Sequence, residues 1–307
     1  MISCTEFIPL YSELFRYLEE LGGHEEVVRY WEYISDTYVA ELLGSAVSGK
    51  GLRGCWEYWA KSLNEEACDF RMELDEPEGT FSIDMRRCPS RGMLNALSHM
   101  EPYYDYCGHC DYYRASLEAV GLRSLRIHTA VNEARCAGVI YDPTKFKGIC
   151  VVDENTEVLD LKPGEHEYFH PDFHSSLNMG IHYIAREHGL DALKEHLELY
   201  TKHVYIRTIE AMQEDPLGAI AARIAETYRL EKAEGALEMV RDGNKLSVKI
   251  AYCPAVKHLR KTGREVTPWF RYTTETVMQT LAEAGGLQFT MESYDEATGA
   301  AAYSFAR

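Results

Sequence analysis

The chain repeats itself, and this repeat constrains the fold more than any other feature of the sequence. The segment at 14–39 has a counterpart at 181–206, and both show helical patterning with a glycine break, Gly22 in the first and Gly189 in the second. Two further blocks follow in the same order, each offset by roughly 165–167 residues. Three ordered matches at one spacing predict an ancient tandem duplication.

Each copy continues with a pair of strand patterns that closes on Cys-Pro, and then with a helical pattern that ends at Gly-Leu. The matched landmarks are Cys88-Pro89 with Cys253-Pro254, and Leu122 with Leu287. Runs of helices followed by runs of strands favour an α+β fold over a doubly wound sheet. We therefore predict two copies of a helical domain with a small antiparallel sheet, over residues 1–155 and 163–307, joined by a linker rich in charge, Pro and Gly.

Composition excludes several classes of function. The 307 residues carry 32 Lys and Arg against 49 Asp and Glu, a formal net charge of −17, and 46% of them are hydrophobic. A globular protein fits these values, whereas a nucleic-acid binder or an anionic-membrane binder would need clustered basic residues. No membrane-spanning stretch, secretory leader or nucleotide-binding glycine motif is found. We therefore expect a cytoplasmic protein with reduced thiols and no nucleotide cofactor.

A cysteine cluster occurs in the first copy only. Cys107, His109, Cys110 and Asp111 lie at the predicted start of a helix, and the second copy has Thr, Glu and Val there. Such a pair of thiols can hold half of a zinc site, or can place one low-pKa thiolate beside a histidine base. The alternative is a pair of partly buried thiols without chemistry.

A histidine cluster opens the second copy only. His170, Asp172 and His174 fall around a predicted helix start, and the first copy has no imidazole at the matching positions. Two imidazoles with a carboxylate suit zinc, iron or manganese, or general acid–base catalysis. Together with Cys107 they are candidate metal ligands. The complementary losses in the two copies fit one composite site or two independent degenerations.

Aromatic residues are frequent around the cysteine cluster and upstream of it. Tyr106 and Tyr113 in the cluster, and Trp59 upstream, are candidate ligand-binding residues, since tyrosines combine an apolar body with a polar tip. Cys88, at the Cys-Pro corner, is a candidate for the mouth of the same pocket. The alternative for all four is packing in the core.

The order of these residues resembles the L-2-amino-thiazoline-4-carboxylate hydrolase-like family. The resemblance rests on Cys88, then Cys110 and Asp111 opening a helix, then Cys136 on a closing hairpin; the second copy keeps only Cys253. The stretch at 170–184 also looks like the opening of uncharacterised bacterial relatives, and this resemblance implies a bacterial protein. The resemblance implies the α+β fold and, by the family's name, hydrolysis of a cyclic thiazoline to N-carbamoyl-cysteine.

The functional hypothesis is a hydrolase that acts on a small ring or another C–N or C–S compound. His174, Cys110, Asp111 and His109 are its candidate catalytic residues, with metal assistance by way of the histidine cluster. Two alternatives remain open: a non-catalytic sensor of a small molecule or metal, and a scaffold with an oligomeric interface, for which a homodimer is the simplest form.

Overall fold

The computed structural model describes residues 1–307 and divides into two compact units. One unit is Leu18–His170, and the other combines Met1–Tyr17 with Pro171–Arg307. The structure contains about 52% helix and 20% strand, with two antiparallel sheets, so the α+β prediction is confirmed. None of the helices is both long enough and apolar enough to cross a membrane.

The Leu18–His170 unit contains one five-stranded sheet of order β3-β4-β2-β1-β5. Its elements are α2 (His24–Ile34), the π-helical segment η2 (Ser35–Gly44), α3 (Ser45–Val47), α4 (Leu52–Glu65), β1 (Asp69–Asp75), β2 (Thr80–Arg87), α5 (Pro89–Ala96), the 3₁₀ segment η3 (Tyr106–Tyr113), α6 (Arg114–Glu118), β3 (Arg123–Ala130), η4 (Val131–Glu133), β4 (Arg135–Tyr141), β5 (Glu157–Leu161) and η5 (Pro163–Glu165).

The other unit contains a four-stranded sheet of order β6-β7-β9-β8. Its elements are η1 (Cys4–Glu6), most of α1 (Phe7–Gly22), α7 (Phe173–Glu187), α8 (Leu190–Val204), α9 (Ile206–Ala211), α10 (Pro216–Leu230), η6 (Glu234–Ala236), β6 (Leu237–Asp242), β7 (Lys245–Ile250), α11 (Pro254–Lys261), α12 (Tyr272–Ala284), β8 (Gln288–Tyr294) and β9 (Ala301–Ala306).

The two sheets have the same topology, as the predicted duplication requires. Read from the opposite edge, the order β8-β9-β7-β6 reproduces β3-β4-β2-β1, and each Cys-Pro follows the second strand and opens a short helix, α5 or α11. The first sheet has one additional strand, β5, which pairs antiparallel with β1. This strand lies in the segment predicted to be a linker, because its charged residues suggested a loop. It pairs with β1 and so covers the backbone edge of that strand.

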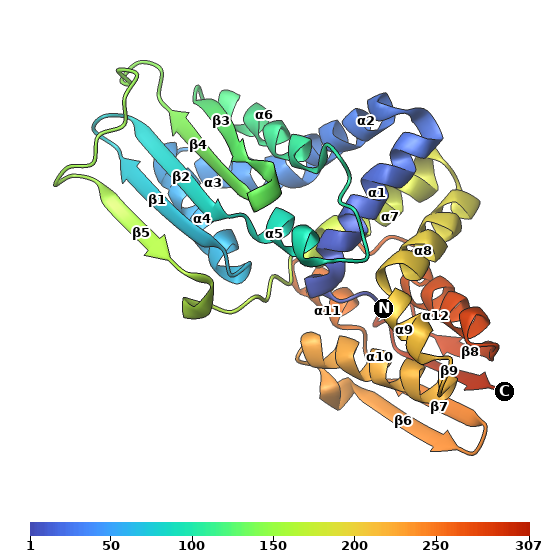
Figure 1. Cartoon of the computed structure of the whole chain (residues 1–307). Helices are drawn as coiled ribbons and strands as arrows, with labels where there is room; N and C mark the ends of the chain where they lie inside the picture. Colours follow the sequence, from blue (N-terminus) through green and yellow to red (C-terminus); the bar gives the residue numbers. More distant parts are fainter. The chain divides into compact units, whose positions relative to one another are not determined.

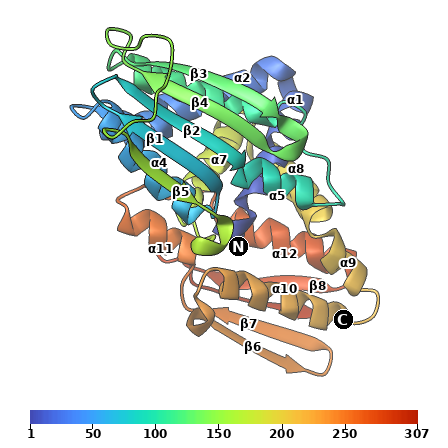
Figure 2. The same cartoon turned by 60° about the vertical axis from the view of Figure 1, so that its left-hand side comes forward.

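Helices cover one face of each sheet, as Figures 1 and 2 show for α4 on β1 and β2 and for α10 on β6 and β7. In α4, every third or fourth residue is buried, and the strands beneath it bury every second residue. The same alternation appears in β7, where Leu246, Val248 and Ile250 are buried. Sequence periodicity therefore sets both layers of each unit.

A buried histidine makes the stability of the unit formed by residues 1–17 and 171–307 depend on pH. His196 on α8 is 2% exposed, its Nδ1 has no hydrogen-bond partner, and burial lowers its pKa from 6.5 to about 3. The unfolded chain binds a proton here below pH 6.5 that the folded chain does not, so stability falls as the pH falls from 6.5 towards 3. Replacing His196 with leucine is expected to make this dependence shallower by about 1.4 kcal/mol per pH unit.

Urea unfolding at a series of pH values measures this slope. Replacing the exposed His99 with leucine is the control and should leave the slope unchanged. An unchanged slope in the His196→Leu variant would show that the buried imidazole is protonated in the folded state.

Candidate functional site

The cysteine cluster lies on η3, a short helical segment held closely against its surroundings. A Cβ atom on Gly108 would lie 2.8 Å from the Trp31 ring, so only glycine permits this approach. The Ser35 hydroxyl of the π-helical segment η2 donates to the Tyr112 carbonyl at 2.6 Å. The segment that carries Cys110 is therefore fixed from two sides.

His109 faces Cys110 in the geometry of a general base. Its Nε2 lies 3.6 Å from the Cys110 Sγ, and its Nδ1 forms a hydrogen bond with the Tyr106 carbonyl oxygen. A carbonyl only accepts, so Nδ1 carries the proton and donates it. In the neutral ring, Nε2 then keeps a lone pair directed at the thiol, which is the tautomer that accepts the thiol proton.

Positive charge around Cys110 stabilises its thiolate. Burial opposes ionisation, but the His109 imidazolium and the Arg126 guanidinium outweigh it and lower the pKa of Cys110 to about 7. Arg126, on β3, donates from Nη2 to the Cys110 carbonyl at 3.1 Å, and its Nε lies 3.3 Å from the Asp111 Oδ1. The pKa of His109 is raised, because the effect of the adjacent thiolate exceeds that of burial.

Neighbouring thiols behave in the opposite way. Burial raises the pKa of Cys107 to about 12, and burial is also the main reason that the pKa values of Cys88 and Cys136 are raised. Only the thiolate is a strong nucleophile. Among these four cysteines, the chemistry is therefore concentrated at Cys110.

Cys110 lines a cavity of about 250 Å³, a size that suits a small molecule. Aromatic and aliphatic side chains form much of the wall, while polar groups converge at one place. The residues that matter for chemistry and recognition are Trp59, Cys110, Asp111, Tyr113, Arg126 and Cys136. The Trp59 ring stacks on Phe81 at 5.8 Å and lies 6.2 Å from the Tyr113 ring, which fixes the aromatic wall.

The structure thus brings together most of the residues predicted around the cysteine cluster. Cys110, Asp111, Tyr113 and Trp59 line the cavity. His109 contacts Cys110 and is itself held by the backbone carbonyl of Tyr106, and neither of these two residues lines the cavity. Cys88 and Cys107 are not among the lining residues, although the Cys110 charge reaches both.

Arg126 was missed at the sequence level. The comparison of the two copies contains the signal, because the residue that matches Arg126 in the second copy is Met291. The asymmetry that marked the cysteine cluster therefore marks this arginine too.

The residues of the predicted histidine cluster do not meet at one point, and each of them contacts different side chains. The His170 Nδ1 lies 2.5 Å from the Glu65 Oε2, within the Leu18–His170 unit. In the other unit, Asp172 accepts from Ser175 and lies 3.2 Å from the His258 Nε2. The ligand group whose atoms lie within 4.8 Å of one another includes His174 with Cys4 and Glu231. Of the four predicted metal ligands, His174 alone belongs to it, so His170, Asp172 and Cys107 do not complete that group.

No protein-family model, curated protein or solved structure matches this chain. The fold and the site define a duplicated α+β protein with a cysteine–histidine pair at a small cavity. A functional proposal therefore rests on this geometry.

Proposed function

We propose that the chain is a cysteine-dependent hydrolase that cleaves a small ring or another C–N or C–S compound. The observation that carries this proposal is the Cys110–His109 pair, 3.6 Å apart, with Cys110 on the wall of a cavity of small-molecule size. A lowered thiol pKa next to a histidine of fixed tautomer is the arrangement that nucleophilic catalysis by cysteine requires. We place the protein in the cytoplasm, where such a thiol stays reduced.

In the first half of the reaction, the Cys110 thiolate adds to an electrophilic carbon of the substrate and forms a C–S bond. The C–N or C–S bond to the leaving atom breaks, and that atom takes the proton from the His109 Nε2. In the second half, His109 removes a proton from water, the hydroxide attacks the same carbon, and the Cys110 thiolate leaves. Each step uses residues of this chain and one water molecule.

Arg126 and Asp111 determine which substrates fit. The Arg126 side chain is 24% exposed and lines the cavity beside Cys110, so it can bind a carboxylate or another anionic group of the substrate. Asp111 holds part of the guanidinium and sets its orientation. A small anionic compound with an electrophilic C–N carbon is therefore the favoured substrate class, in agreement with the thiazoline carboxylate that the family resemblance implies.

Alkylation with iodoacetamide across pH tests the nucleophile. Cys110 is expected to be labelled at a rate that rises with pH through about 7 and then levels off. The Cys110→Ala variant should lose this fast phase. The Cys107→Ala variant is the matched control, since that thiol lies on the same segment with a pKa raised to about 12, and it should keep the fast phase.

Turnover is then measured with 2-amino-thiazoline-4-carboxylate and with a panel of small cyclic amidines and amides that carry a carboxylate. Product from wild type and none from Cys110→Ala supports the hydrolase. Saturable binding of these compounds without product would favour the sensor. Slow labelling of Cys110 at pH 7 would overturn the proposed nucleophile.

A further inference from the structure

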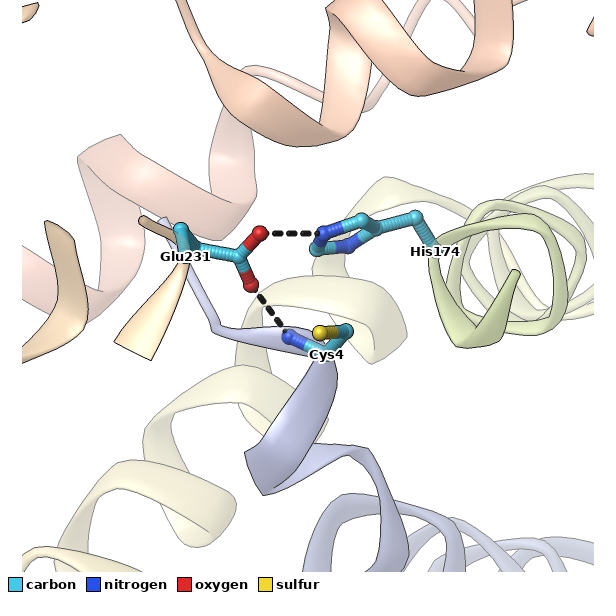
Figure 3. Close-up of side chains that lie close together, drawn as sticks. All are labelled: Cys4, His174 and Glu231. Carbon is cyan, nitrogen blue, oxygen red and sulfur yellow. Dashed lines mark hydrogen bonds and ion pairs between the residues drawn. The ribbon is translucent and has the colours of Figure 1, made fainter. Parts of the chain in front are cut away.

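A second cluster of reactive side chains lies outside this site, in the unit made of residues 1–17 and 171–307. Figure 3 shows Cys4, His174 and Glu231 directed at one another from η1, α7 and the residue after α10. The ligand atoms of all three lie within 4.8 Å of one another. Each residue is buried, with 1% of Cys4, 1% of His174 and 7% of Glu231 exposed.

The carboxylate of Glu231 links the other two residues. Its Oε2 lies 3.0 Å from the His174 Nε2, and its Oε1 accepts from the Cys4 N–H at 2.6 Å.

The position of Glu231 at the end of a helix favours a cation beside its carboxylate. Glu231 is the C-cap residue of α10, where the helix dipole presents its negative end. A buried carboxylate at a helix C-terminus is stabilised by a cation.

The His174 ring contacts the carboxylate through one nitrogen. Its Nε2 lies 3.0 Å from the Glu231 Oε2, whereas its Nδ1 is buried and has no hydrogen-bond partner. The two ring nitrogens point in diverging directions, so a metal ion held by Glu231 and His174 together binds Nε2 and replaces this hydrogen bond.

We propose that Cys4, His174 and Glu231 form a zinc site that fixes the N-terminal segment, residues 1–17, to residues 171–307 of the same unit. Thiolate sulfur, imidazole nitrogen and carboxylate oxygen are the donors that zinc prefers, and three of them leave one position of a tetrahedron for a further ligand. This site is independent of the cysteine chemistry proposed above.

The role of the ion is structural. Cys4 and Glu231 are 227 residues apart in the chain, and His174 and Glu231 are 57 apart. Bringing such distant residues together costs loop-closure entropy, and the binding of a metal to them becomes part of the folding free energy.

Metal content and cobalt spectroscopy test the site. The full chain is produced in zinc-supplemented medium, purified without chelator or metal-affinity resin, and analysed for zinc. About one zinc per chain is expected, with a lower melting temperature after chelator treatment. Cobalt in place of zinc should give a thiolate charge-transfer band that Cys4→Ser removes and His174→Gln weakens. Cys55→Ser replaces an equally buried cysteine outside the cluster and should keep the band.

Other outcomes would contradict the proposal. If the folded wild-type protein binds neither zinc nor cobalt stoichiometrically, the three residues form a hydrogen-bonded network and no metal site. Metal that is lost in a Cys107→Ser/Cys110→Ser variant and kept in Cys4→Ser would belong to the cysteine cluster instead. If Cys4→Ser fails to fold, X-ray absorption of the wild-type zinc protein decides, since one sulfur ligand is expected and none or several would overturn the site.

Discussion

Replacing His109 with glutamine is expected to lower kcat/KM of the proposed hydrolysis by about 10²- to 10⁴-fold, the usual contribution of a positioned acid–base group. The variant loses both the proton donor for the leaving atom and the imidazolium that stabilises the Cys110 thiolate. The pKa of Cys110 should therefore rise from about 7 towards its ordinary value of 9.0 or above, because burial then outweighs the remaining effect of Arg126.

The pH profile of Cys110 alkylation measures this shift directly and needs no substrate. The midpoint of the rate profile should move upward by roughly two pH units. At pH 7 the thiolate fraction falls from about one half to about one in a hundred, which the higher nucleophilicity of a more basic thiolate offsets in part. Replacing the exposed His128 with glutamine is the control. An unmoved midpoint in His109→Gln would show that Arg126 alone ionises the thiol.

Replacing Gly54 with alanine is expected to destabilise the Leu18–His170 unit by about 3 kcal/mol. Gly54 lies inside α4, where alanine would normally stabilise a helix by about 1 kcal/mol. Here a Cβ atom would lie 2.1 Å from the Ala46 carbonyl oxygen and 2.7 Å from the Val47 Cα. Both neighbours are backbone atoms, so α3 and α4 must separate, and this opens the layer that carries Trp59.

Urea unfolding monitored by tryptophan fluorescence measures the loss. Replacing Gly164 with alanine is the matched control, since a Cβ there meets nothing within 4 Å, and its free energy of unfolding should stay within about 0.5 kcal/mol of wild type. Equal stability of the two variants would mean that α3 and α4 can separate at little cost.

Much of the fold follows from sequence periodicity. The repeat predicted two sheets of one topology, and alternation placed β7 correctly because that strand buries one face. Strand β5 was missed because none of its residues is buried, and pairing with β1 holds it in place. The grouping of residues 1–17 with residues 171–307 was not predicted either, since local patterning contains no information on which distant surface a helix covers.

The site was predictable to the extent that neighbouring residues form it. His109 and Cys110 are adjacent in sequence, and their pairing depends only on the local turn of η3. Arg126 comes from another strand, and Glu231 reaches His174 from the end of another helix. Partners that meet only through the tertiary fold leave no local pattern, although the asymmetry between the copies could have identified Arg126.

The course of α1 has a consequence for biosynthesis. This single helix, Phe7–Gly22, begins in one compact unit and ends in the other, because the division falls after Tyr17. Residues 1–17 leave the ribosome well before the residues 171–307 that surround them in the finished protein. In many multidomain proteins each domain folds as soon as it has been synthesised. Here residues 1–17 must remain available until residues 171–307 have been made, because the two segments fold into one unit. The unit made of residues 1–17 and 171–307 can therefore not be cut out as one continuous piece.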